Sequence, residues 1–152
     1  MVTTGDKAII DTNVLLRANN PTLPLHVEAD RLIKETRSKG LELWISRQII
    51  REYLSQVTRP NFFAVPMSIE KALQQIDDLQ LLFNVADETA DVTRTLLDLV
   101  KTYPTGGKQI HDANIVATML VYGIETLLTQ NVADMKRFSG KVTILPLEQG
   151  IS

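Results

Sequence analysis

Polar side chains that can bind a metal ion follow two apolar stretches of this 152-residue chain. Asp11 comes directly after the β-branched stretch Lys7–Ile10, and Asn131 and Asp134 come after the apolar stretch 124–128. In open α/β sheets, sites form beyond the carboxyl ends of the strands. If the two stretches are neighbouring strands, we expect these three side chains to lie at one site.

Two further carboxylates lie in segments with a helical pattern. Asp112 is followed at the third, fourth and seventh positions by Ile115, Val116 and Met119, so it belongs to the stripe predicted to face the core. Glu52 is embedded in another apolar helical segment. An isolated carboxylate on a core-facing stripe costs several kcal/mol. We therefore expect pairing, protonation or a metal ion to offset this cost.

The metal that suits such a cluster is Mg²⁺ or Mn²⁺. Carboxylates that converge on one pocket repel one another, and an octahedral ion with oxygen ligands relieves the repulsion. One ion can activate water for attack on a phosphodiester, and a second, roughly 3.5–4 Å away, can stabilise the departing oxygen. Zinc is the poorer candidate, because the chain has no cysteine and its histidines, His26 and His111, are not at ligand spacing.

Each candidate also has a purely structural interpretation when it is taken alone. The segment Asp11-Thr12-Asn13 can be a turn and an N-cap after a strand, since all three residue types favour caps. Asp112 can cap its helix, and Glu52 can be a solvated or paired helix residue. A strand that ends in Asp11 also has a superficial likeness to aspartyl-phosphate phosphatases. That chemistry needs a second aspartate two residues on, where this chain has Asn13.

The elements that must position these residues alternate along the chain. Proline and asparagine at 19–24 predict a loop that interrupts any early helix. Short strands separated by helices predict an α/β fold with a mainly parallel central sheet flanked by helices. We expect one domain over residues 1–152, because no repeat or linker is visible. The predicted strands are 7–10, 41–45, 81–85, 124–128 and 142–147, and the predicted helices are 26–38, 46–56 with Ser46 as N-cap, 68–79, 87–101, 108–121 and 132–138.

Composition excludes several classes of protein. The absence of cysteine excludes disulfides, thiolate zinc sites, iron–sulfur clusters and cysteine nucleophiles. Sixteen Lys+Arg against eighteen Asp+Glu give a net charge of −2, which argues against a protein that coats nucleic acid through bulk charge. The longest apolar stretch, 115–124, is far shorter than the about 20 residues that span a bilayer. With no signal peptide visible, we expect a cytoplasmic protein without a membrane segment.

Three segments together resemble the hallmark blocks of the PIN domain: AIIDTNVL at 8–15, IHDANIVA at 110–117 and LLTQNVAD at 127–134. The resemblance runs in order over nearly the whole chain. It implies a PIN-like three-layer sandwich and a metal-dependent ribonuclease. At this length it also suggests the VapC-type toxins of bacterial toxin–antitoxin pairs.

The resemblance also implies roles for individual residues. Asp11 corresponds to a bridging metal ligand, and Asp112 and Glu52 to ligands or a base that orients water. Asp134 is the weakest ligand, because Met135 follows it where the family usually has phenylalanine and Asn131 is neutral. The fourth site residue is therefore either Asn131 or Asp134, and the number of metals stays open. The predicted catalytic and metal-binding residues are Asp11, Glu52, Asp112 and Asp134.

Substrate contacts are predicted from neighbouring polar residues. Thr12 and Asn13 are expected to position Asp11 or a metal-bound water. Arg17 and Lys108 are the preferred cations for substrate phosphates among several near the site, although each alone can be a solvated surface charge. The predicted substrate-binding residues are Thr12, Asn13, Arg17, Lys108 and Asn131.

The resemblance implies three partners: an RNA substrate, a cognate antitoxin and a second copy in a homodimer. The apolar stripe on the helix near 68–82 can pack internally or against such a partner. The alternative function is a catalytically degenerate PIN domain that binds RNA or protein, which the neutral Asn131 and the negative charge favour. Retained carboxylates at Asp11, Glu52 and Asp112 count against it, since an inactive site has no reason to hold buried like charges.

Overall fold

The computed structural model describes residues 6–147. Its five strands form one sheet in the order β3-β2-β1-β4-β5, and every neighbouring pair is parallel. The predicted α/β fold with a parallel sheet is therefore confirmed. The strands are β1 (Lys7–Ile10), β2 (Glu42–Ser46), β3 (Asn84–Ala86), β4 (Thr126–Thr129) and β5 (Thr143–Pro146).

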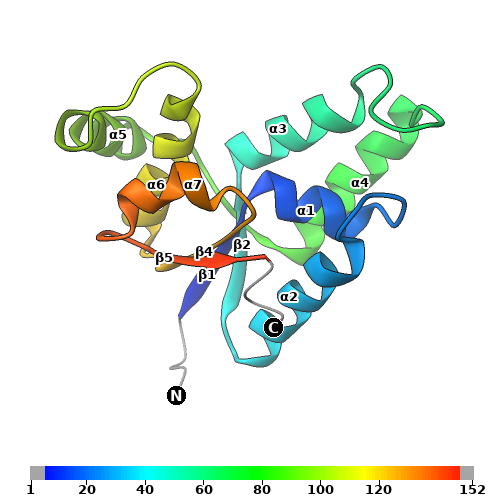
Figure 1. Ribbon diagram of the computed structural model, residues 1–152, viewed down its shortest axis with the longest axis horizontal. Helices are drawn as coiled ribbons and strands as arrows, with labels where there is room; N and C mark the ends of the chain where they lie inside the picture. The colour runs from blue at the N-terminus through cyan, green and yellow to red at the C-terminus, as the bar shows by residue number, and fades with distance from the viewer. Residues whose placement is uncertain (1–5, 148–152) are drawn as a thin grey trace.

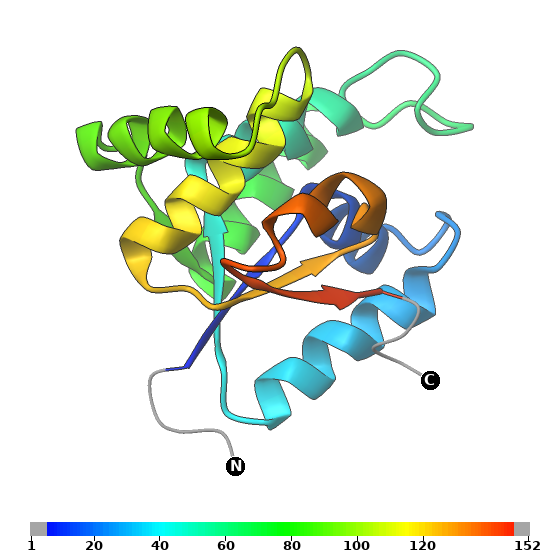
Figure 2. The same ribbon diagram turned by 60° about the vertical axis from the view of Figure 1, so that its left-hand side comes forward.

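Helices connect every strand to the next, as parallel strands require. Figures 1 and 2 show α2 on one side of the sheet and α5, α6 and α7 on the other. None of the helices between residues 6 and 147 is long and apolar enough to cross a membrane. The helices are α1 (Thr12–Asn19), α2 (His26–Ser38), α3 (Arg47–Val57), α4 (Ile69–Leu82), α5 (Ala90–Thr102), α6 (Gln109–Tyr122), α7 (Val132–Met135) and the 3₁₀ helix η1 (Lys136–Phe138).

The two central strands are almost entirely buried. Ile9 and Ile10 of β1 and Leu127 and Leu128 of β4 have no exposed surface, as expected for parallel strands covered on both faces. The strand order reverses at β1, because the chain builds β2 and β3 on one side and then places β4 and β5 on the other. The carboxyl ends of β1 and β4 thus flank the switch point where open α/β sheets bind ligands.

The structure adds one helix that was not predicted and corrects one strand boundary. The expected loop at 19–24 does not prevent an early helix, because α1 is complete before it and begins at once after β1 with Asp11 as its N-cap. The strand predicted over 81–85 is wrong in its first half. Leu81 and Leu82 extend α4, since no helix-breaking residue precedes them, and β3 begins only at Asn84.

The apolar stripe of α4 divides between the core and the surface. Ile76 and Leu79 are buried, whereas Ile69 is 60% exposed and Leu73 is 49% exposed. Ile76 and Leu79 therefore pack internally, whereas Ile69 and Leu73 leave apolar surface uncovered.

Ser46 and Ser68 allow a matched test of the cap that begins α3. Each hydroxyl accepts a bond from the N–H three residues on, but Ser46 is fully buried and Ser68 is exposed. We expect Ser46→Ala to lower the free energy of unfolding by about 1–2 kcal/mol, because the N–H of Ile49 loses its partner away from water. Ser68→Ala should cost roughly 0.5–1 kcal/mol, since water replaces its hydroxyl. Urea unfolding measures both, and equal losses would contradict the role given to burial.

Candidate active site

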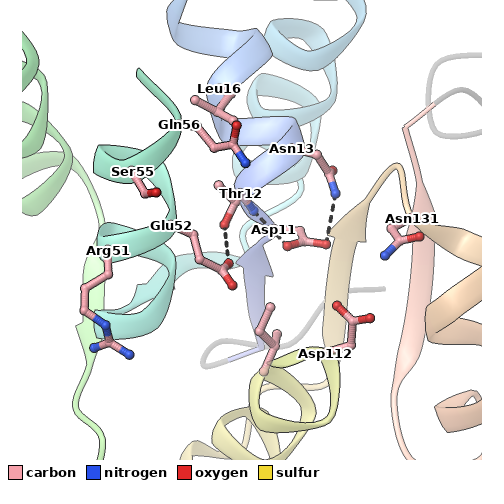
Figure 3. A pocket seen from close by; sticks show the side chains of 11 residues that line it. Asp11, Thr12, Asn13, Leu16, Arg51, Glu52, Ser55, Gln56, Asp112 and Asn131 are labelled. Atoms are coloured by element: carbon pink, nitrogen blue, oxygen red, sulfur yellow. Dashed lines mark hydrogen bonds between the residues drawn. The ribbon is translucent and has the colours of Figure 1, made fainter. Parts of the chain in front are cut away.

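A pocket of about 490 Å³ opens at the carboxyl ends of β1 and β4. Figure 3 shows Asp11, Glu52 and Asp112 around one space, on the end of β1, on α3 and on α6 respectively. Three predicted acidic residues that are far apart in the sequence are thus brought together. The lining residues are Asp11, Thr12, Asn13, Leu16, Arg51, Glu52, Ser55, Gln56, Asp112, Ile115 and Asn131.

Asp11 is held in place by three hydrogen bonds. Its Oδ1 accepts from the Thr12 N–H at 2.8 Å, and its Oδ2 accepts from Thr129 Oγ1 at 2.7 Å and from Asn13 Nδ2 at 3.2 Å. Burial raises the pKa of Asp11, and the nearby charge of Glu52 adds to this, while the three hydrogen bonds oppose it. The carboxylate is therefore oriented by its neighbours before any ligand binds.

Glu52 is tied to Asp11 through Thr12. The Thr12 hydroxyl donates to Glu52 Oε1 at 2.8 Å, while the N–H of the same residue donates to Asp11. The other oxygen of Glu52 accepts from Gln48 Nε2 at 3.1 Å. One threonine thus links the carboxylate at the end of β1 to the carboxylate on α3.

Asp112 has the clearest electrostatic signature in the pocket. Its pKa is raised from 3.8 to about 6, first by burial and then by repulsion from Asp11, Asp134 and Glu52, with His111 acting in the opposite direction. These contributions show that three other acidic groups lie within electrostatic reach of Asp112. Such a cluster favours a proton or a cation near Asp112.

Asn131 and Asp134 occupy different places. Asn131 lines the pocket, and its N–H donates to Thr129 Oγ1 at 2.9 Å. Asp134 lies on α7 and is not among the lining residues, although its charge raises the pKa of Asp112. Both predicted candidates for the fourth position are therefore close to the acidic cluster, with the amide in the wall.

The cation in the pocket wall is Arg51. It makes a two-pronged ion pair with Glu88, at 2.9 and 3.0 Å. Neither Arg17 nor Lys108, the cations preferred from the sequence, is a lining residue. Arg17 instead donates to Gln130 Oε1 at 2.8 Å and to a loop carbonyl, and Lys108 is exposed just before α6.

Sequence reasoning missed two residues that hold the site together. Thr129 is the last residue of β4 and has no exposed surface. It is a polar strand end like Asp11, so the rule that identified Asp11 also applies to it. Gln48 stands four residues before Glu52, the spacing of neighbours on one helix face. Its bonds to α6, however, have no signal in the sequence.

The oxygen atoms that the pocket offers as ligands suit a hard divalent cation. Among residues 6–147, no three acidic or histidine side chains are already grouped closely enough to enclose a metal ion. Mg²⁺ is commonly held by only one or two carboxylates and keeps several waters. Asp11 also retains unused acceptor capacity, because two carboxylate oxygens offer about four lone-pair positions and three are used. The oxygen-rich, mutually repelling set therefore fits Mg²⁺ or Mn²⁺.

The chain is similar in sequence to a known ribonuclease. It is 27% identical over 135 residues to the protein named Ribonuclease VapC48 of Mycobacterium tuberculosis, covering 86% of this chain and 90% of the relative.

Solved structures share the fold. VapBC-1 from nontypeable Haemophilus influenzae matches with a TM-score of 0.68 and 17% identity over 93% of this chain and 98% of that one. VapBC2 from Rickettsia felis, bound to a promoter DNA fragment, gives 0.67 and 17% over 91% and 97%. Mycobacterium tuberculosis VapC20, a Sarcin-Ricin loop cleaving toxin, gives 0.61 and 20% over 80% and 87%.

The family model for the PIN domain matches residues 8–141, which include every carboxylate of the pocket. This match covers most of the chain and agrees with the parallel sheet, the strand-end position of Asp11 and the segment after β4. The chain therefore belongs to the PIN domain family.

Proposed function

We propose that this protein is an endoribonuclease that hydrolyses RNA phosphodiester bonds with the help of Mg²⁺ or Mn²⁺, and that it is the toxin of a toxin–antitoxin pair. The observation that carries the proposal is the meeting of Asp11, Glu52 and Asp112 in one pocket at the switch point of the sheet. The similarity to Ribonuclease VapC48 supports the reaction, and PIN-domain ribonucleases generally use divalent ions.

In this proposal the four acidic residues have different roles. Asp11, the most buried and most firmly held, is the central metal ligand, and Asp112 and Glu52 are further ligands or orient the attacking water. Asp134 is an outer ligand, because it lies near Asp112 without lining the pocket. An ion held by these residues would neutralise negative charge and activate a water for attack.

The chain's own polar groups orient the other components. Thr12 and Asn13 keep the Asp11 carboxylate in a single orientation, and Asn131 presents an amide to substrate in the pocket wall. We further propose that Arg17 and Lys108 contact phosphates outside the pocket and that Arg51 contacts a phosphate at its wall, since a guanidinium can pair with both Glu88 and a phosphate oxygen.

Partner proteins are part of the same proposal. Several structural neighbours are VapBC assemblies, and one is described as a toxin–antitoxin complex from Klebsiella pneumoniae. We propose a cognate antitoxin and a homodimer for this chain as well. The exposed apolar side chains Ile69 and Leu73 at the start of α4 support a surface that a partner covers.

A degenerate, non-catalytic module is the second candidate function. The observation that favours it is the neutral Asn131 at the pocket wall in place of an acid. The meeting of Asp11, Glu52 and Asp112 in one pocket argues for catalysis, because a binding module gains nothing from keeping repelling carboxylates together. Measurements of metal binding and of RNA cleavage distinguish the two candidate functions.

Metal binding is tested by the melting temperature with and without Mn²⁺. At about 100 times its Kd, an ion that binds only the folded protein stabilises it by about 2.7 kcal/mol, which corresponds to roughly 5–10 °C for a domain of this size. We expect this rise in the wild type and its loss, together with loss of RNA cleavage, in Asp112→Asn. Asp77→Asn is the control, since Asp77 is exposed on α4 away from the pocket. An unchanged wild-type melting temperature would refute the metal site.

The raised pKa of Asp112 also predicts how stability depends on pH without metal. Because its folded pKa of about 6 exceeds 3.8, the folded form binds more protons than the unfolded form between those values. The contribution of Asp112 to the free energy of unfolding therefore falls as the pH rises from about 4 to about 6. We expect Asp112→Asn to lack this fall and to exceed the wild type in stability above pH 6. Urea unfolding across this range measures it, and parallel curves for the two proteins would contradict the assignment.

A further inference from the structure

The two helices that carry Glu52 and Asp112 belong to separate groups of packed elements. The helix α3, which carries Glu52, packs on α1, α4 and β2, whereas α6, which carries Asp112, packs chiefly on α5 and also on α7. Figure 1 shows these groups on opposite sides of the upper end of the sheet. The separation between the Glu52 and Asp112 carboxylates is thus not determined by one tightly packed helix pair.

A buried glutamine amide spans the two groups. Gln48 of α3 is only 4% exposed. Its Nε2 donates to Glu52 Oε2 at 3.1 Å and to the His111 carbonyl of α6 at 2.8 Å, and its Oε1 accepts from Asn114 Nδ2 at 2.7 Å. A carbonyl and a carboxylate can only accept, so the orientation of the amide is determined by its partners.

The other polar contacts described here that connect α3 to the group of α5 and α6 are exposed. Arg51 pairs with Glu88 and Arg47 pairs with Asp87, both ahead of α5, and the two arginine side chains are 63% and 47% exposed. Exposed ion pairs contribute little, because solvent screens them. A buried amide with both hydrogens and its oxygen in use has no comparable competitor from water.

We infer that Gln48 is the positioning residue that orients the Glu52 carboxylate relative to Asp112. This inference rests on the proposed function. The same Nε2 holds Glu52 and the backbone carbonyl immediately before Asp112, so it couples the two carboxylates through one rigid amide plane. Without it, Glu52 keeps only the bond from the Thr12 hydroxyl and can turn about that contact. Losing the partner that orients a metal ligand typically weakens metal affinity or activity 10–100-fold.

The test compares Gln48→Met with Gln74→Met. Methionine keeps the length of glutamine but cannot make the bonds. Gln74 is a matched control, because its Nε2 also donates to the carboxylate four residues on, Asp78, at the same 3.1 Å, on the exposed face of α4. Calorimetry with Mn²⁺ alone should show a Kd that is about 10–100-fold higher in Gln48→Met and unchanged in Gln74→Met.

Kinetics and a double variant give a second readout. With a single-stranded RNA of mixed sequence, we expect Gln48→Met to lower kcat with little change in KM, since Gln48 is not a lining residue of the pocket. If Gln48 acts through Glu52, adding Gln48→Met to Glu52→Gln should cause no further loss in Mn²⁺ affinity. Losses that multiply in the double variant would overturn the inference.

The behaviour of the wild type distinguishes failure of this inference from failure of the proposed function. A wild type that neither binds Mn²⁺ nor cleaves RNA refutes the proposed function. A wild type that does both, with Gln48→Met equal to it, refutes the role of Gln48 alone. Should Gln48→Met melt below the assay temperature, Asn114→Ala replaces it, because it removes one bond to the Gln48 amide and keeps the two donations. A smaller loss of Mn²⁺ affinity in the same direction is expected there, and an unchanged affinity would overturn the inference.

Discussion

Repulsion among carboxylates at the carboxyl ends of β1 and β4 is the constraint around which the site is built. A parallel sheet brings these ends together, and the reversal of strand order at β1 leaves the space above them open. Asp11 is placed there by the register of the strands, since its N–H donates to the Leu128 carbonyl at 2.9 Å. Burial raises the pKa of Asp112 first, and repulsion from the other acids around this space raises it further.

Neutral hydrogen-bond donors offset part of that repulsion. Thr129 and Asn13 donate to Asp11, Thr12 donates to both Asp11 and Glu52, and Gln48 donates to Glu52. Among the described residues, no buried side-chain nitrogen or oxygen atom lacks a hydrogen-bond partner. Such a network favours the ionised carboxylates and limits their rotation. The site is therefore oriented in advance and still carries excess negative charge, which suits a divalent cation.

Membership in the PIN domain family and the geometry of the pocket give one consistent account of the protein. The net charge of −2 opposes binding to RNA through bulk electrostatics. In the proposed function, recognition of a phosphodiester at this pocket depends on a bound cation and a few local groups, among which Arg51 is the cationic side chain in the wall.

Much of the fold and site could be predicted from the sequence. Apolar periodicity, caps and glycine stops placed most helices and strands, because these signals are local in the chain. A strand end, an apolar helical segment and a core-facing stripe made Asp11, Glu52 and Asp112 candidates, and the resemblance to the PIN domain implied their roles. The prediction failed where local signals were weak: α1 was not predicted, and the boundary between α4 and β3 was misplaced. Only the tertiary structure decided that Arg51 lies in the wall, that Asn131 lines the pocket while Asp134 does not, and that Gln48 spans α3 and α6. Those features depend on how separate elements pack, and hydrogen bonds between residues 63 and 66 positions apart leave no pattern in a single sequence.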